Sequence, residues 1–287
     1  MFGKLLKHEL GATGRTLAPL YGAVLILAGL TSLLARIGRT GLTNPVLTQA
    51  GSGGLFKSNL LSLLASVLSV LLLLGLFAVV IVTFVLHVTR FYRMLGDEGY
   101  LAFTLPVTPG QQLGAKLLSA QLWTLGAVAV MVGCVAMLIW ASAIPMAADN
   151  SQEVVGFVDL GFARSALVLG AFFLLMLLGM AAAYLMMYLS CAVGSQWPQN
   201  RMMASVITFV VVGTALQILS LVGLAAFTFS GAMVPWLLWV TSGAWTAAEI
   251  GMSIAGIFGM LSAILLVLDA VGFLATRWLL TKKLNLT

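Results

Sequence analysis

Charged residues are scarce in this sequence: Asp, Glu, Lys and Arg make up only 8% of it, whereas 61% is hydrophobic. A soluble domain is typically about a quarter charged, so this chain could not cover a water-exposed surface with polar groups. A lipid bilayer is the solvent that suits such a composition. We therefore expect an integral membrane protein that is surrounded by lipid and has no nucleic-acid partner.

Groups that hold metals or nucleotides are also few. The sequence has two cysteines and two histidines, and none of them stands at the spacing of a metal site. A phosphate-binding loop needs a glycine directly before a Lys-Ser or Lys-Thr pair, but the one Gly-Lys pair in the sequence, Gly3-Lys4, is followed by Leu5. We expect no catalytic residue, metal or cofactor on this chain, so any ATP and Mg²⁺ that drive it must be bound by another subunit.

Long apolar runs are what the sequence does contain. A bilayer is crossed by about 20 apolar residues, and in lipid the backbone must satisfy its own hydrogen bonds, so each such run should be helical. No signal-peptide cleavage pattern follows the first run, which we interpret as a retained helix. The predicted fold is an all-α membrane protein of one domain, 1–287, with six transmembrane helices near residues 17–35, 60–86, 117–143, 165–192, 204–229 and 253–276.

The distribution of basic residues predicts the orientation, because cytoplasmic loops are enriched in Lys and Arg. With the N-terminus inside, the outer set is Arg36, Arg39, Lys57 and Arg164. The larger inner set is Lys4, Lys7, Arg15, Arg90, Arg93, Lys116, Arg201, Arg277, Lys282 and Lys283. We therefore expect both termini in the cytoplasm, although the three basic residues of the first outer loop argue the other way.

Two segments differ from simple spans. Segment 1–16 is amphipathic, with Phe and Leu at helical spacing and Lys4 and Lys7 elsewhere, which predicts an elbow helix in the inner interface or a merely helical tail. Segment 230–252 is broken by Pro235 and rich in Trp, which favours the headgroup zone. We interpret it as re-entrant, with an external loop as the alternative.

The longest polar cytoplasmic stretch, 88–108, lies between the second and third helices. Asp97 and Glu98 stand between glycines, and arginines and aromatic side chains, the groups that anchor protein interfaces, flank them. Thr108, Pro109 and Gln111 form a capping box that predicts the start of the next helix. The stretch is either a docking knob for a cytoplasmic protein or a solvated charge cluster with its aromatics in the headgroups.

Several pieces of the chain resemble the permeases of bacterial ABC-2 type transporters, a family found largely in Gram-positive bacteria. The matching pieces of the polar stretch are Arg90-Phe91-Tyr92, Gly96-Asp97-Glu98-Gly99-Tyr100-Leu101 and Phe103-Thr104-Leu105-Pro106. The opening Lys4-Leu5-Leu6-Lys7 and the ending Lys282-Lys283-Leu284-Asn285-Leu286 are similar to the ends of the family's chains. The layout of six helices with both termini inside agrees along the whole chain.

The resemblance implies a permease in the bacterial plasma membrane that pairs with a second copy or a paralogue and binds two cytoplasmic ABC ATPase subunits. An elbow helix would occupy 1–16, and a coupling helix at 97–103 would insert into the ATPase. The docking residues it implies are Arg90, Arg93, Asp97, Glu98, Tyr100 and Phe103. The cargo class it implies is hydrophobic or amphipathic, and the family includes exporters of peptide toxins such as phenol-soluble modulins.

A few polar or adaptable side chains fall inside the predicted spans. Asp269 is the sole acid there, so it should be protonated or paired with His87 or Arg90, and it is either a proton or cargo contact or a structural group. Met176, Met180 and Tyr184 share one helix and could form a cargo path or simply face lipid. The leading hypothesis is an exporter permease; the alternatives are an ion-coupled carrier using Asp269 and a lipid-modifying membrane enzyme.

Overall fold

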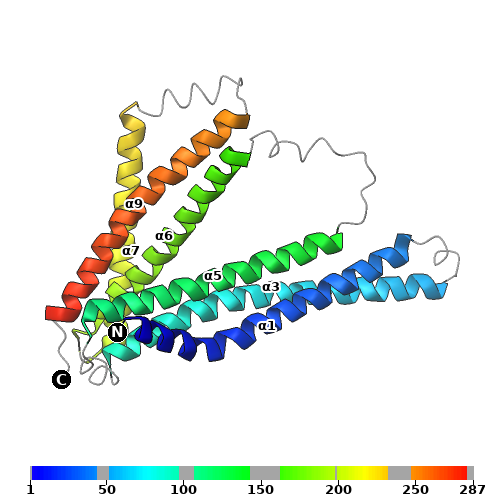
Figure 1. Ribbon diagram of the computed structural model, residues 1–287, viewed down its shortest axis with the longest axis horizontal. Coiled ribbons are helices and arrows are strands. Elements are labelled where there is room, and N and C mark those ends of the chain that lie inside the picture. Colours follow the sequence, from blue (N-terminus) through cyan, green and yellow to red (C-terminus); the bar gives the residue numbers. More distant parts are fainter. Residues whose placement is uncertain are drawn as a thin grey trace. The chain divides into compact units, whose positions relative to one another are not determined.

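The computed structural model describes residues 2–43, 52–96, 107–142, 162–197, 199–231 and 247–282, and helices dominate all six stretches (Figure 1). Each helix contains a window that is long and apolar enough to cross a membrane, which confirms the six predicted spans. The helices are α1 (Phe2–Thr43), α3 (Ser52–Leu95), α5 (Pro109–Ser142), α6 (Phe162–Gly194), α7 (Arg201–Phe229) and α9 (Ala247–Lys282).

The helices extend well beyond the apolar runs. Helix α3 has 44 residues, which corresponds to about 66 Å at 1.5 Å per residue, about twice the hydrocarbon thickness of a bilayer. The last helix begins at Ala247, so residues 247–252 belong to α9 and not to the predicted re-entrant segment. Residues 232–246, the rest of that prediction after Gly231, lie outside the described part of the chain.

The first helix contains the segment predicted as an elbow. The structure has one continuous helix, α1, with Pro19 inside it, and Figure 1 shows that this helix changes direction in its N-terminal part. Proline removes a backbone donor and kinks a helix, whereas membrane helices tolerate it. The predicted boundary between an elbow at 1–16 and a span from 17 therefore marks no interruption of the helix, and an interfacial position for 1–16 stays a prediction.

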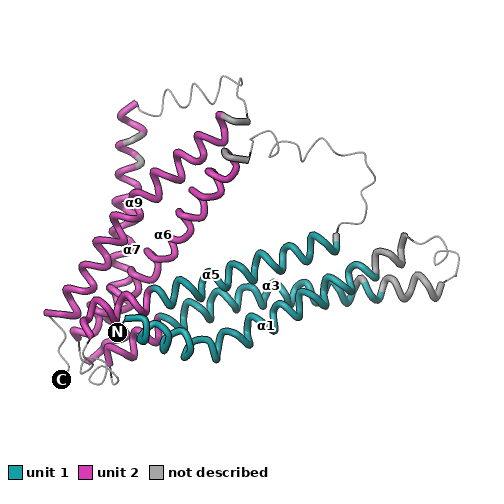
Figure 2. Tube along the Cα trace, in the orientation of Figure 1, with its two compact units in different colours: residues 1–87, 118–150 teal, residues 88–117, 151–287 magenta. Residues whose placement is uncertain are grey.

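The chain divides into two compact units (Figure 2): residues 1–87 with 118–150, and residues 88–117 with 151–287. In the first unit, Tyr21 joins three helices. Its ring meets the Trp123 ring edge to face at 5.8 Å between centroids. Its hydroxyl lies 2.8 Å from Thr83 Oγ1 and donates to the Trp123 carbonyl oxygen at 2.9 Å. The core around it is formed by Leu17, Tyr21, Val24, Ala28, Leu72, Val79, Ala127, Val130 and Cys134.

In the second unit, α6 packs along both α9 and α7. Helices α6 and α9 run in the same direction, because Phe172 lies 5.6 Å from Phe258 between ring centroids and Leu185 lies beside Gly272 further along both helices. Helix α7 runs the opposite way, and Ser205 near its start lies against Gly194 at the end of α6. Glycine lets the two backbones approach closely, a common device where helices associate in lipid.

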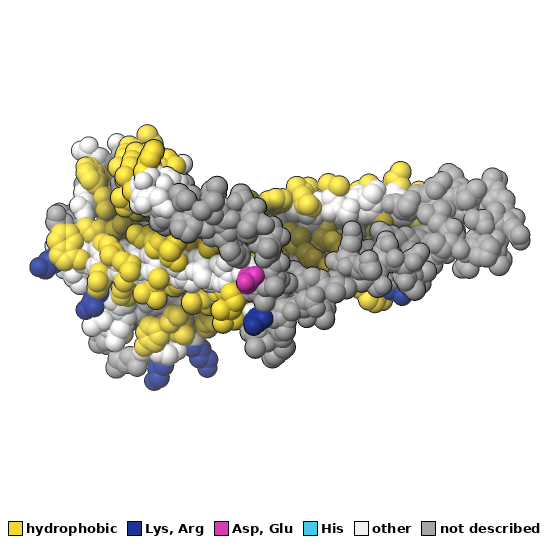
Figure 3. Space-filling view, turned by 90° about the horizontal axis from the view of Figure 1, so that it is seen from above, with side chains coloured by type: hydrophobic (Ala, Val, Ile, Leu, Met, Phe, Trp, Pro, Cys, Tyr) yellow, Lys and Arg dark blue, Asp and Glu magenta, His cyan; other side chains and the backbone are white. Residues whose placement is uncertain are grey.

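The described surface is mostly apolar, as the composition predicts. In the face drawn in Figure 3, hydrophobic side chains cover most of the described surface and charged side chains are few. Along α7, apolar side chains such as Ile207, Val211 and Leu219 are 59%, 61% and 64% exposed. Patches of this size would aggregate in water, so they indicate contact with lipid or with another membrane helix.

Candidate functional site

The predicted coupling stretch begins with an ordered helix. Residues 88–95 continue α3, so the loop boundary predicted near 88 was eight residues too early. Within this last part of α3, Phe91 is fully buried, and Met94 and Leu95 are almost fully buried. The spacing of three and four residues puts these side chains on one face of the helix, which packs into the second unit.

The six docking residues implied by the resemblance separate into two groups. Arg90 and Arg93 lie on α3, where Arg90 is half-buried and Arg93 is exposed in the last turn. A basic side chain there is favourable because the C-terminal end of a helix carries partial negative charge. Asp97, Glu98, Tyr100 and Phe103 lie outside the described residues, so their grouping with the arginines stays a prediction.

A column of aromatic rings anchors the end of α3 to α6. The Phe91 ring stacks on Tyr188 with 4.1 Å between centroids and 21° between planes. Tyr184 lies one turn along α6, with its ring 6.1 Å from that of Tyr188. All three side chains are buried. The last turns of α3 are therefore packed against α6 through buried aromatic rings.

The C-terminal end of the predicted coupling stretch is fixed by a helix cap and by a packing contact. The predicted capping box is confirmed, because the Thr108 backbone N–H donates to Gln111 Oε1 at 3.3 Å and the Gln111 N–H donates to Thr108 Oγ1 at 3.4 Å. Two residues into α5, a Cβ on Gly110 would lie 3.2 Å from Cδ and Nε of Arg277. The start of α5 is therefore closed by a cap and packed against the last part of α9.

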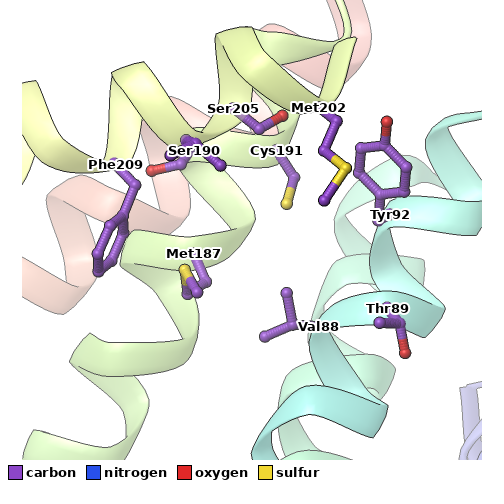
Figure 4. A pocket seen from close by; sticks show the side chains of 10 residues that line it. Val88, Thr89, Tyr92, Met187, Ser190, Cys191, Met202, Ser205 and Phe209 are labelled. Carbon is purple, nitrogen blue, oxygen red and sulfur yellow. The ribbon is translucent and has the colours of Figure 1, made fainter.

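A half-open cavity of about 240 Å³ lies between the ends of α3, α6 and α7 (Figure 4). Figure 4 shows Tyr92 and Met202 side by side at one end and Phe209 at the other. The lining comprises Val88, Thr89 and Tyr92 from α3, Met187, Ser190 and Cys191 from α6, and Met202, Ser205, Val206 and Phe209 from α7. This cavity directly adjoins the helix end that leads into the coupling stretch.

The walls of the cavity offer little hydrogen bonding to a ligand. The Ser190 hydroxyl donates to the Met186 carbonyl oxygen, and the Ser205 hydroxyl donates to that of Arg201, each at 2.8 Å within its own helix. Met187 and Met202 contribute flexible, polarisable side chains that adapt to varied apolar shapes. The arrangement can hold a hydrocarbon group, and it contains no set of groups for bond-making chemistry.

Asp269 lies on the face of α9 that packs against α6. Ser262, one heptad before it, and Thr276, one heptad after it, are buried, and Gly272 beside it contacts Leu185. Both carboxyl oxygens of Asp269 are buried, and neither has a hydrogen-bond partner among the described residues. The pairing with Arg90 or His87 that the sequence raised is therefore not found in the described part of the chain.

The other residues of the predicted cargo path do not form one surface. Met176 is 44% exposed, whereas Tyr184 is buried in the ring column at 2%. The cavity lies further along α6, at Met187, and on α7, whose Met202 and Phe209 the sequence reading missed. Their spacing of seven residues puts both on one face of α7, but nothing in the sequence says that this face borders a cavity.

Comparison with known proteins adds no identification: no protein-family model, no curated protein and no solved structure matches the chain. Among the described residues, no three His, Cys, Asp or Glu side chains are grouped so that they could hold a metal ion. Function must therefore be argued from the membrane-spanning architecture, the two ends of the coupling stretch, the cavity and Asp269.

Proposed function

We propose that the chain is the permease subunit of an ATP-driven exporter, working as a pair with a second permease and with separate cytoplasmic ATPase subunits. The cargo is hydrophobic or amphipathic, such as a peptide, a lipid or a drug-like molecule. Six apolar helices and the resemblance of the stretch around Gly96 to ABC-2 type permeases support the proposal. The sequence also lacks the full G-x-x-x-x-G-K-S/T phosphate-binding motif, because its Lys57-Ser58 pair follows Phe56 where the motif needs a glycine.

The observation that carries the proposal is the way both ends of the coupling stretch are attached. Phe91 stacks on α6 before the stretch, and Gly110 packs against α9 after it. A partner that pushes on the ten residues between 96 and 107 therefore moves packed helix ends. When the ATPase closes on nucleotide, movement of these helix ends can switch the helices from one packing arrangement to another.

The test replaces Asp97, Glu98 and Tyr100 together by alanine in the full chain. The protein is co-expressed and co-purified with ABC ATPases from the same organism, and cargo-stimulated ATP turnover of the complex is then measured in liposomes. We expect the variant to lose the ATPase or to lose the stimulation, because charged and aromatic side chains anchor protein interfaces.

A matched variant controls for the loss of acidic charge. Asp149, Glu153 and Asp159, in the predicted outer loop, are replaced together by alanine, and this protein should bind the ATPase and transport as the wild type does. Both variants are checked for the same thermal stability in detergent. ATPase binding and stimulated turnover at wild-type levels in the Asp97 variant would contradict the docking assignment, as would cargo transport by the chain alone.

A second function, ion-coupled transport, is favoured by one observation: the carboxyl oxygens of Asp269 are buried and have no hydrogen-bond partner within the described ranges of the chain. Ionisable groups in membrane helices commonly mark proton or ion pathways. If the chain were such a carrier, a proton gradient would drive uptake by the chain alone in liposomes, and Asp269→Asn would abolish it. Transport that requires the ATPase and is unchanged in Asp269→Asn at all pH values would exclude this function.

A further inference from the structure

The cavity between α3, α6 and α7 lies beside two close contacts of α6 with α7. Helix α6 meets α7 closely at Gly194 with Ser205 and again at Met186 with Gly213. The two contacts are eight residues apart on each helix, which is about 12 Å at 1.5 Å per residue. The lining residues Met187 and Phe209 fall between these contacts, and Met202 lies three residues before Ser205, so the cavity extends along α7 past the first contact.

The apolar lining of the cavity favours a hydrocarbon ligand over a polar one. Its two serine hydroxyls already donate to backbone carbonyl oxygens of their own helices. A peptide or sugar placed here would bury amides or hydroxyls against methionine, valine and phenylalanine, and unpaired polar groups are costly to bury. An acyl chain has no such groups and gains from the contact.

Two arginines stand at the end of the cavity nearest the helix termini. Arg93 follows the lining residue Tyr92 and is exposed, and Arg201 precedes the lining residue Met202 as the first residue of α7. The Arg201 Nη1 atom lies 3.8 Å from the Cβ position of Gly96, just past the end of α3. Basic groups therefore lie where the helices end, and Phe209 lies about 12 Å further along α7.

We propose that this cavity binds one acyl chain of an anionic phospholipid, whose phosphate lies between Arg93 and Arg201. The order of groups along the cavity, with basic residues beside one end and an apolar lining beyond them, matches the order of groups along a phospholipid. Basic sites between membrane helices bind anionic headgroups elsewhere. The site is independent of ATP-driven transport, and it adjoins the last turns of α3.

The positive charge of the two arginines sets how strongly the site should prefer an anionic headgroup over a zwitterionic one. A basic residue near anionic lipid contributes about 1 kcal/mol, which is about fivefold in affinity. Arg93→Gln and Arg201→Gln should therefore each reduce the preference for phosphatidylglycerol over phosphatidylcholine by about fivefold. The cavity lining is unchanged in these variants, so binding of the acyl chain itself should persist.

The experiment uses the full chain in nanodiscs with phosphatidylglycerol that carries a diazirine on its acyl chain, followed by mass spectrometry of the labelled residues. We expect labels on Met187, Cys191 and Met202, displaced by unlabelled phosphatidylglycerol and much less by phosphatidylcholine. Val206→Phe should fill the cavity and reduce this labelling several-fold. Val211→Phe, at a position of similar exposure on another face of α7, is the matched control and should leave it unchanged.

The outcomes separate this site from general lipid contact. Labels spread evenly along the exposed residues of α7, equal competition by both lipids, or full labelling of Val206→Phe would each overturn the proposal. Displacement by an amphipathic peptide but not by phosphatidylglycerol would overturn it in favour of a cargo site. The variants are accepted only if their thermal stability in detergent equals that of the wild type, and because no ATPase is present, the result does not depend on the exporter proposal.

Discussion

The contact between α6 and α7 at Gly194 makes the sharpest stability prediction. A Cβ added to Gly194 would collide with Ser205 Oγ, and it would lie 2.6 Å from the Ser205 backbone nitrogen and 2.8 Å from its Cα. A rotation of the serine side chain would relieve the first collision but not the other two, because backbone atoms cannot rotate away. Gly194→Ala should therefore force the two helices apart.

The cost can be estimated from the size of the movement. Ordinary Cβ contacts begin at 3.4 Å, so the Ser205 nitrogen must move by 0.8 Å (3.4 minus 2.6). Overpacking of this kind typically costs about 1–3 kcal/mol. The usual gain of up to about 1 kcal/mol from Gly to Ala inside a helix should be small here, because Gly194 is the last residue of α6.

The assay is reversible unfolding in mixed detergent micelles, with Gly179→Ala as the control. Gly179 is on the same helix and has nothing within 4 Å of its Cβ position, so its substitution should be neutral or slightly stabilising. Combining Gly194→Ala with Ser205→Gly should restore little stability, since the backbone collisions persist. Equal stability of the two alanine variants, or full rescue by Ser205→Gly, would refute the reasoning.

Two further predictions concern single hydrogen-bonding groups. Tyr21→Phe removes the hydrogen bonds to Thr83 and Trp123, and each bond between membrane helices contributes about 0.6 kcal/mol. The variant should therefore lower the unfolding free energy by about 1 kcal/mol, and Thr83→Val should lower it by about half as much. An unchanged unfolding free energy in both variants would contradict this assignment. Thr108→Ala should destabilise the first turn of α5 by about 0.5–2 kcal/mol and speed hydrogen exchange at the Gln111 amide. Thr108→Ser should preserve the protection of this amide. Equal exchange rates in the wild type and both variants would contradict the assignment of Thr108 as the cap.

The sequence allowed the spans and the start of α5 to be predicted for physical reasons. Lipid leaves the backbone no partner but itself, so long apolar runs become helices, and a capping box is a local device that needs no tertiary information. The end of α3 was missed because Arg90, Tyr92 and Arg93 made the segment look like a loop. Phe91, Met94 and Leu95, at helical spacing, were the signal that the helix continues.

The candidate site was predicted only in part. The aromatic and acidic stretch around Asp97 was found from its composition, but the cavity depends on where two helices touch. Nothing along the sequence shows that Gly194 meets Ser205, so Met202 and Phe209 looked like any apolar residues of a span. The burial of Tyr184 likewise depends on helix packing that the sequence does not show.

The close helix contacts and the cavity have one physical origin. Between helices in lipid there is little hydrophobic driving force, so association depends on close packing at small residues. Gly194 and Gly213 supply that closeness at two points of α6 and α7, while the larger side chains of Met187 and Phe209 lie between those points. Packing through glycines therefore leaves a narrow apolar space between the contacts. In a bilayer the group available to fill such a space is an acyl chain, so the contacts that hold the helices together also shape a site for lipid.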